Sequence, residues 1–556
     1  MTLQRDLLRV AKGATLVLDH LIAQNQSGVT RRAASARYHA NELAKILIEM
    51  ARERLAQQGS SPFSEAPTSG SGPGSSARAA EEDLIGFSAV KDEELSAKIS
   101  AQNNGQPAKA MREAHVPSTQ LGRMFGFGSL AARMAVGAAF ERATGSGNTS
   151  SGSGSQQRYQ MSDENAERLA ETLCRMRGAA LKLGQMLSVQ DEGMLPPALA
   201  RALDRVKQAA DYMPSKQLEQ QLSSELGPNW REKLLEFEPI PIAAASIGQV
   251  HRAKLLDGTV VAMKIQYPGV ASSIESDLNN LKTLVTMTGL LPAGLFVDEI
   301  IRVARTELAV ECDYLAEAQA QTRYRALVAA DSVLSKHLSV PEVFPELSTR
   351  QVLTSRFVHG VTIDKTVGLP QSVRNAIART VLISTMRELF EWRFIQSDPN
   401  FGNYLYDDVS DPVKRTIHSI DFGASREYPK PFVDGYMKIV WAAANQDRAT
   451  VLAVSKELKF LTGDETPEMV EAHVDAALVV GEAFRSHEKF DFGTARLTQR
   501  IGQYGGVFMK YRLTPPPTEA YSLHRKLAGA ILLCVKLKAE ITCRDILEKT
   551  YENYVW

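Results

Sequence analysis

Three oxygen-bearing side chains stand close together in the sequence between residues 396 and 423. Asp398 is followed five residues later by Asn403, and Asp421 opens an Asp-Phe-Gly tripeptide after a short apolar stretch. In phosphoryl transfer, one aspartate accepts a hydroxyl proton or orients the nucleophile, while an asparagine and a second aspartate bind Mg²⁺ at the nucleotide phosphates. Mg²⁺ prefers hard oxygen ligands and takes only one or two carboxylates. The spacing therefore predicts Asp398 as a catalytic carboxylate and Asn403 and Asp421 as metal ligands.

The same residue types are common in turns, so the tripeptide alone is weak evidence. A second copy, Asp491-Phe492-Gly493, has no strand predicted before it and no Asp/Asn pair upstream. We interpret this second copy as a surface turn. The first copy gains weight only if the rest of a nucleotide site lies upstream of it.

A lysine at the end of a predicted strand provides part of that site. Residues 259–265 follow an Asp-Gly turn at 257–258 and predict the return strand of a hairpin. Lys264 shares a face of this strand with Val260 and Ala262. A lysine that ends Val-Ala-Met-Lys is typical of the kinase lysine that holds the α- and β-phosphates.

The loop before this hairpin departs from the kinase pattern. Alanines stand where flexible glycines are expected, in the run Ala243-Ala244-Ala245-Ser246, and only Gly248 remains. Each Cβ discourages positive φ and blocks the close approach of backbone N–H groups to phosphate. We expect a stiffer nucleotide loop with an altered nucleotide preference. A run of helix formers after prolines is also typical of an ordinary helix start, and both interpretations stay open.

Residues 298–327 predict one helix with four acids, Glu307, Glu311, Asp313 and Glu317. A kinase needs one acid here to pair with the strand lysine. Glu311 and Glu317 would lie about 120° apart around such a helix, so they can serve different partners. Their spacing does not choose between them.

Residues 351–360 predict a strand that runs into a glycine turn and forms the hinge between two lobes. We expect the backbone there to receive adenine, and the candidate residues are Ser355, Arg356, Phe357 and Val358.

Residues 373–392 predict an amphipathic helix that leads the chain to Asp398, and the sequence after Gly423 is mostly helical in pattern. Two kinase features are missing. Gln396-Ser397 replace the His-Arg pair that precedes the catalytic aspartate, and no Ala-Pro-Glu follows Asp-Phe-Gly. We therefore expect neither a peptide-docking segment nor regulation by activation-loop phosphorylation.

A leucine-rich helix is predicted over residues 165–190. Lys182 and Gln185, three residues apart, share a face distinct from the leucines, and Gly184 between them permits close approach of another backbone. This pair is a candidate part of the site. An exposed Lys/Gln pair on a solvated face is the alternative.

Composition excludes several classes of protein. The 64 basic and 64 acidic residues balance, so no global charge favours nucleic acid. The four cysteines have neither CxxC nor Cys/His spacing, which argues against zinc and a disulfide framework. No uncharged apolar run reaches the ~20 residues of a spanning helix.

Residues 121–140 nevertheless form a glycine-rich apolar segment. Arg133 lies near its middle, where an arginine costs about 2.5–3.5 kcal/mol on membrane-insertion scales. The sequence favours an interfacial helix with Arg123 and Arg133 toward anionic headgroups. A helix packed on the soluble domain is the alternative.

These observations divide the chain into seven regions. They are a helical region (1–58), a flexible linker (59–115), a membrane-associating helical segment (116–143), a Ser/Gly linker (144–160), a helical extension (161–230), a kinase-like N-lobe (231–360) and a mainly helical C-lobe (361–556).

Taken together, these motifs resemble the UbiB family of atypical kinases, in particular its mitochondrial members in coenzyme Q (ubiquinone) biosynthesis. The similarity runs from about residue 116 to the C-terminus. The motifs that carry it are Lys182-x-Gly184-Gln185, Ala243-Ala244-Ala245-Ser246, Val261-Ala262-Met263-Lys264, Glu311-x-Asp313, Asp398-Pro399-x-x-x-Asn403 and Asp421-Phe422-Gly423.

The resemblance implies an α+β, protein-kinase-like bilobal fold with the helical extension packed over the active site. It implies that Glu317 pairs with Lys264, that Glu311 meets Lys182 of the extension, and that ATP or ADP binds with Mg²⁺. It also implies an ATPase or small-molecule kinase on the matrix face of the mitochondrial inner membrane. The implied partners are anionic membrane lipid, other coenzyme Q biosynthesis proteins and a second copy of the chain, with no nucleic acid. A protein kinase acting in trans and a nucleotide-binding scaffold are the alternatives.

Overall fold

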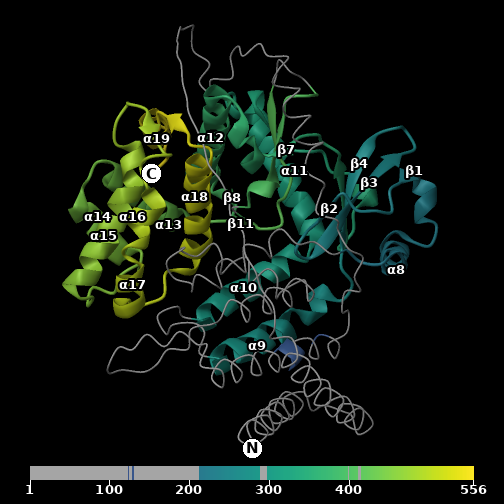
Figure 1. The fold of residues 1–556 in the computed structure, drawn as a ribbon, viewed down its shortest axis with the longest axis horizontal. Coiled ribbons are helices and arrows are strands. Elements are labelled where there is room, and N and C mark those ends of the chain that lie inside the picture. The colour runs from purple at the N-terminus through teal and green to yellow at the C-terminus, as the bar shows by residue number, and fades with distance from the viewer. Residues whose placement is uncertain (1–122, 124–127, 131–211, 289–296, 399, 411–414) are drawn as a thin grey trace, which may run out of the picture.

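The computed structural model describes residues 123, 128–130, 212–288, 297–398, 400–410 and 415–556 (Figure 1). Lys182 and Gln185 lie outside the described residues, as do both linkers, the predicted helices of residues 1–58 and Arg133. The described residues form a lobe built on an antiparallel sheet and a second, mainly helical lobe. This architecture confirms the predicted α+β, bilobal kinase-like fold.

The sheet of the first lobe has the strand order β1-β3-β4-β6. β2 pairs with residues 249 and 250, near the start of β3. Along β4 the side chains alternate between buried and half-buried, so that Met263 faces the core while Lys264 faces the other side. The hairpin between β3 and β4 closes at Gly258, whose φ is +87°, as the Asp-Gly pair predicted. The strands are β1 (Leu234–Phe237), β2 (Ala243–Ala244), β3 (Gly248–Leu255), β4 (Val260–Gln266) and β6 (Val352–Arg356).

The alanine run forms a strand and a tight turn. Ala243 and Ala244 pair with Val250 and Gln249 of β3, and Ala245 N donates to the carbonyl of Gly248 at 2.7 Å. The alternative of an ordinary helix start is therefore wrong.

The single helix predicted over residues 298–327 is also wrong. The chain forms α10 (Val297–Glu311) and α11 (Tyr314–Ala330), with a break at Cys312 and Asp313. Asp313 has an extended backbone, and its carboxylate accepts from the N–H groups of Leu315 and Ala316, so it caps α11. Glu311 and Glu317 consequently lie on different helices, and the expected angle of about 120° between them does not apply.

Four short strands bracket the two loops that carry the predicted catalytic residues. β8 (Phe394–Gln396) lies just before Asp398, and β9 (Tyr404–Asp407) begins directly after Asn403. β10 (Thr416–Ser419) leads to Asp421, and β11 (Ser425–Glu427) follows Gly423. β9 pairs with β10, and β8 pairs with β11. The strands on either side of one loop therefore pair with the strands on either side of the other.

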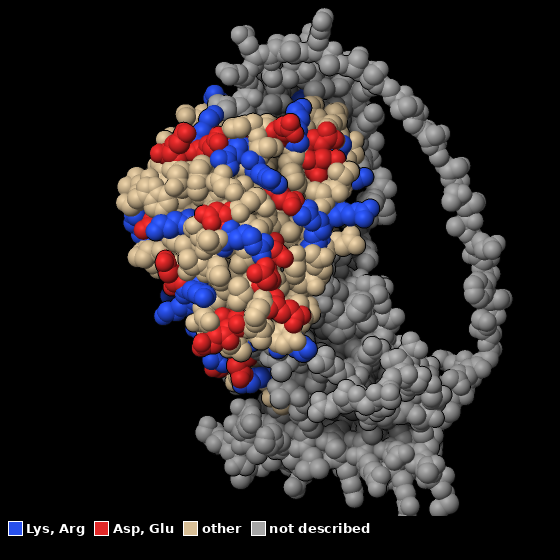
Figure 2. Space-filling model, turned by 90° about the vertical axis from the view of Figure 1, so that its left-hand side faces the viewer, with Lys and Arg blue, Asp and Glu red and all other residues tan. Residues whose placement is uncertain are grey.

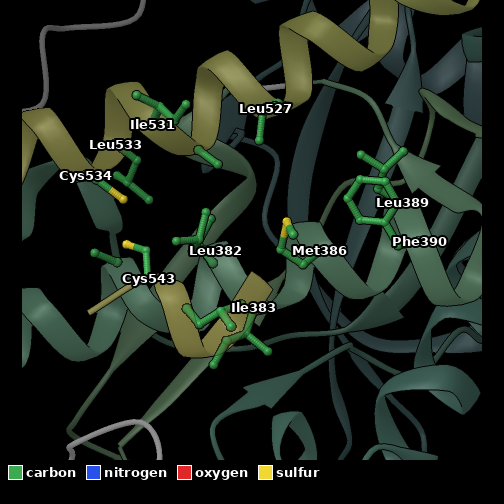
Figure 3. Close-up of a cluster of buried hydrophobic side chains, with 14 of the residues drawn as sticks. Leu382, Ile383, Met386, Leu389, Phe390, Leu527, Ile531, Leu533, Cys534 and Cys543 are labelled. Carbon is green, nitrogen blue, oxygen red and sulfur yellow. The ribbon is translucent and has the colours of Figure 1, made fainter. Parts of the chain in front are cut away.

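The second lobe is organised around α12 (Gln371–Met386), which continues as a π-helical segment, Arg387–Trp392. Every residue from 380 to 386 is buried, so the prediction of an amphipathic helix is wrong for this half. The long helix α18 (Thr518–Lys536) runs beside α12, and Figure 3 shows Leu527 and Ile531 of α18 facing Leu382 and Met386 across this core.

The remaining elements complete the two lobes. In the first lobe they are α8 (Ser215–Leu226) and α9 (Val270–Thr288). The small strands are β5 (Leu338–Ser339), β7 (Val361–Thr362), β12 (Phe490–Asp491) and β13 (Glu540–Ile541). In the second lobe the helices are α13 (Lys430–Ala444), α14 (Arg448–Glu457), α15 (Pro467–Gly481), α16 (Leu497–Gly502), α17 (Gly505–Tyr511) and α19 (Arg544–Glu552).

The second Asp-Phe-Gly copy is a turn, as predicted, but it is not wholly at the surface. The Asp491 carboxylate accepts from the N–H of Gly493 at 2.8 Å, as turn aspartates do. Phe492, however, is buried, and a two-residue strand that pairs with β13 precedes it.

The structure contradicts the prediction that Arg123 faces lipid headgroups. Arg123 is buried, and its Nε donates to both carboxylate oxygens of Asp277 on α9 at 2.8 Å. Leu130 is buried in the core of the first lobe. At these positions the segment packs on the kinase fold, and a buried guanidinium needs such a partner. Within the described residues, no helix is both long and apolar enough to cross a bilayer.

The outer side of the helical lobe carries charges of both signs. Figure 2 shows lysine and arginine interspersed with aspartate and glutamate on this face. Arg448 of α14, for example, pairs with Asp475 of α15 at 2.6 Å. A mixed surface of this kind produces no extended field of one sign on this side.

Gly248→Ala tests the close packing at the start of β3. A Cβ there would lie 2.6 Å from the Ile265 carbonyl oxygen and 2.7 Å from Tyr314 Oη. Overpacking of this kind costs typically about 1–3 kcal/mol, so we expect a lower melting temperature by circular dichroism. Gly502→Ala is the control, because a Cβ at Gly502 meets nothing within 4 Å. Equal melting temperatures for the two variants would contradict the packing described.

Candidate active site

The ammonium group of Lys264 lies between two carboxylates. Its Nζ donates to Glu317 Oε1 at 2.7 Å and to Asp421 Oδ2 at 3.3 Å. The Lys264 and Glu317 side chains are 15% and 1% exposed, whereas that of Asp421 is 31% exposed. Strand β4, helix α11 and the loop after β10 therefore converge on one cation.

Burial and charge act in opposite directions on Lys264. Burial alone would lower the pKa of Lys264, but Asp421 and Glu317 together raise this pKa well above its usual value. Burial raises the pKa of Glu317 to about 7, although the Lys264 ammonium opposes this change. Lys264 therefore remains a cation at neutral pH, and its charge offsets the cost of enclosing two carboxylates.

The position of Glu317 follows from the break between α10 and α11. Asp313 caps α11 and also accepts from Arg350 Nη2 at 2.9 Å, which fixes the first turn of the helix. Glu317 lies one turn later, on the side that faces β4. The geometry agrees with the pairing of Lys264 and Glu317 that the family resemblance implied.

The Asp-Phe-Gly loop is fixed by its phenylalanine and its glycine. Phe422 is buried against Tyr324 of α11, with ring centroids 5.0 Å apart. A Cβ at Gly423 would lie 3.2 Å from Glu317 Oε2, which is tighter than an ordinary contact. Gly423 N also donates to Asp421 Oδ1 at 3.1 Å. These contacts hold Asp421 toward Lys264.

Asn403 is joined to this loop through its backbone. Its carbonyl accepts from Ile420 N at 3.0 Å, one residue before Asp421. The Asn403 side chain is buried, and no described residue provides a partner for its Nδ2. On the other side of the loop, Asp398 is half-buried and accepts from Asn400 N at 3.3 Å.

The pair Asp421 and Asn403 fits a divalent cation. The ends of a side-chain amide differ by a 180° rotation, so the buried end of Asn403 that lacks a partner can present an oxygen. One carboxylate and one amide oxygen suit Mg²⁺, which keeps most of its waters. The described residues contain no group of three or more His, Cys, Asp or Glu side chains that could hold a metal. Asp421 and Asn403 would hold such an ion together with its bound waters.

The predicted hinge residues lie where β6 ends. Ser355 pairs with Ala262, and Arg356 pairs with Val261 of β4. The N–H of Phe357 donates to the carbonyl of Val260 at 3.0 Å. The N–H of Phe357 is therefore already used within the sheet, and Val358 follows in the irregular segment before β7.

In the alanine loop, Ala245 N is likewise bonded within the turn, to Gly248 O. Ala243 is exposed, while Ala244, Ala245 and Ser246 are half-buried. An N–H already bonded to its own turn does not bind phosphate, so this loop differs from a glycine-rich cradle in its hydrogen bonding.

The structure does not bring every candidate to Lys264. Glu311 lies at the end of α10, buried, and belongs to a different helix from Glu317. Lys182 and Gln185 lie outside the described residues, so their predicted contact with Glu311 stays a prediction.

Sequence reasoning missed Tyr314. Lys264 Nζ lies 5.1 Å from the centre of the buried Tyr314 ring, within range of a cation–π interaction. No described residue hydrogen-bonds to the Tyr314 hydroxyl. The position between the cap Asp313 and Glu317 was the only sequence feature that could have indicated it, and recognising it required the helix break.

Asp421→Asn tests the metal site. The substitution removes the carboxylate that would bind Mg²⁺, so we expect the Mg²⁺-dependent rise in melting temperature with ATP to disappear. The protein without nucleotide should melt close to the parent. Asp491→Asn is the matched control, because it alters the same tripeptide outside the site, and it should keep the rise. A rise of equal size in Asp421→Asn would refute the assignment.

Comparison with known proteins identifies the family of the chain. Residues 205–455 match the model of the ABC1 atypical kinase-like domain. The chain is 48% identical over 465 residues to "Atypical kinase COQ8B, mitochondrial" of Danio rerio, covering 82% of this chain and 73% of that protein. It is 40% identical over 456 residues to "Atypical kinase COQ8, mitochondrial" of Saccharomyces cerevisiae, covering 82% and 89%.

A solved structure, the complex of Rv3197 with erythromycin from Mycobacterium tuberculosis, matches with a TM-score of 0.49 and 23% identity, covering 70% of this chain and 96% of that one. The identities to the fish and yeast proteins extend over most of both sequences in each pair. The chain therefore belongs to the ABC1 family of atypical kinases, which is the UbiB family that its motifs resemble.

Proposed function

We propose that this atypical kinase turns over Mg-ATP at Lys264 and supports coenzyme Q (ubiquinone) biosynthesis on the matrix face of the mitochondrial inner membrane. The observation that carries the proposal is the contact of one half-buried ammonium with both Glu317 and Asp421. This arrangement is the one that phosphoryl transfer requires of a kinase lysine, its helix acid and the Asp-Phe-Gly aspartate. The mitochondrial site and the pathway come from the family resemblance and from the names of the relatives.

Each residue has a distinct task in this proposal. Lys264 binds the α- and β-phosphates, and Glu317 holds its ammonium in place. Asn403 and Asp421 hold Mg²⁺, which neutralises charge on the phosphates when it is bound. Asp398 orients the attacking hydroxyl or water and accepts its proton.

The acceptor is a small molecule or water in our proposal. Gln396 and Ser397 stand where a kinase that docks peptides carries His-Arg, and both are buried. None of the described residues bonds to the side-chain amide of Gln396. We further propose that Lys182 pairs with Glu311 and holds the helical extension over the site, which would exclude peptides.

ATP turnover by the purified full chain tests this function. We expect Mg²⁺-dependent release of phosphate from the parent and loss of at least about tenfold in Asp421→Asn, since a metal ligand is removed. The assay is run with phosphatidylcholine vesicles, with and without an anionic lipid, and the anionic vesicles should raise the rate.

Lys182→Ala should loosen the extension, and we expect it to change turnover or autophosphorylation without lowering the melting temperature.

Other outcomes separate the alternatives. Transfer of phosphate to added proteins by the parent would favour a protein kinase acting in trans. ATP binding without turnover, under all lipid conditions, would favour a nucleotide-binding scaffold.

A further inference from the structure

We propose that Lys526, on the long helix α18, is a positioning residue that fixes the chain on both sides of the catalytic loop between Asp398 and Asn403. The proposal rests on the function proposed above and adds a residue that lies outside the kinase motifs of the sequence.

The contacts of Lys526 reach the chain on both sides of this loop. Its Nζ lies 3.1 Å from Glu388 Oε2 and donates to Tyr404 Oη at 2.9 Å. Glu388 Oε2 in turn accepts from Gln396 N at 3.0 Å. Gln396 lies two residues before Asp398, and Tyr404 follows Asn403 directly. One ammonium therefore supports the loop before its catalytic aspartate and after its metal ligand.

The carboxylate that mediates the first contact is itself held in place. Glu388 lies in the π-helical segment that ends α12, and its Oε1 accepts from Ser384 Oγ at 3.1 Å. Single π-helical turns occur frequently at functional sites. This turn directs the end of α12 toward β8, so that a buried side chain meets the backbone of the catalytic loop.

A buried ion pair of this kind is a poor device for stability alone. Lys526 and Glu388 are 5% and 0% exposed, and removing both charges from water costs several kcal/mol per ion before their attraction offsets it. Apolar residues of similar volume would often stabilise the fold equally well. What such residues would lack is the set of directed, charge-assisted hydrogen bonds to Gln396 N and Tyr404 Oη.

Lys526 keeps its charge in this environment. Burial alone would lower the pKa of Lys526, while Glu388 and Tyr404 raise this pKa above its usual value.

The neighbouring residue fixes α18 at the same point: Arg525 Nη2 lies 2.9 Å from both carboxylate oxygens of Glu307 on α10.

Further along α18, Lys536 Nζ lies 5.5 Å from the ring centre of Phe401, within the catalytic loop itself. α18 thus contacts α10 through Arg525, the start of β9 through Lys526 and the catalytic loop itself through Lys536.

The test separates positioning from stability by replacing the pair. Lys526→Met alone leaves a buried carboxylate without its cation and should lower the melting temperature. Lys526→Met with Glu388→Met removes both charges and should recover much of that loss. We nevertheless expect kcat for ATP in the double variant to stay about tenfold or more below the parent, because a small displacement of catalytic groups has effects of this size.

Two further variants and a control test the individual hydrogen bonds. Lys526→Met with Glu388→Gln keeps a side-chain oxygen for Gln396 N and should recover part of kcat. Tyr404→Phe removes a single hydroxyl and preserves the packing, so it should fold, and we expect kcat to fall about threefold. Lys456→Met, at an exposed lysine of α14, is the control and should match the parent.

Hydrogen exchange provides a readout that does not depend on turnover. Backbone amides between residues 396 and 404 should exchange faster in the Lys526→Met/Glu388→Met variant than in the parent, while the strands of the first lobe exchange equally.

Parent values of kcat in both this variant and Tyr404→Phe, with unchanged exchange, would overturn the proposal. A parent without ATP turnover would refute the proposed function, and exchange alone would then decide the role of Lys526.

Discussion

One ammonium group, that of the half-buried Lys264, organises the site. Glu317 and Asp421 approach it from different lobes of the fold, and neither carboxylate would be tolerated so close to the other without a cation between them. The alternation of β4 directs Lys264 away from the core, and the cap of α11 places Glu317 opposite it. Removing one partner of a buried ion pair leaves the other charge uncompensated, which costs about 3–5 kcal/mol. The cost of enclosing charge therefore requires these three side chains to lie close together.

The catalytic loops are held by short elements and not by large ones. Strands of three or four residues flank the loops of Asp398 and Asp421 on both sides, and such strands have little stability of their own. A second buried ion pair, between Lys526 and Glu388, lies beneath them and connects them to the two longest elements of the helical lobe, α12 and α18. Phe422 packs against Tyr324 of α11 and adds an apolar contact that holds the loop of Asp421.

The local parts of this arrangement could be predicted from the sequence, and the distant parts could not. The Asp-Gly turn and the strand face of Lys264 depend on adjacent residues or on a period of two. The helix break at Asp313 was not predicted, because a capping aspartate between two apolar-patterned stretches resembles one more acidic residue of a longer helix. Ion pairs between remote segments leave no trace in periodicity, so the contact of Arg123 with Asp277, 154 residues away, was unforeseen. The role of Lys526 was hidden for the same reason.

A double-mutant cycle on nucleotide affinity tests the central claim, that Glu317 acts by holding Lys264. The affinity for Mg-ATP is measured by titration calorimetry for the parent, Lys264→Met, Glu317→Gln and the double variant. If the carboxylate works through the ammonium, the second substitution should cost little once the first is made, with a coupling energy of about 0.5–3 kcal/mol. Losses that simply add, with no coupling between the two positions, would show that Glu317 does not position Lys264 and would contradict the account.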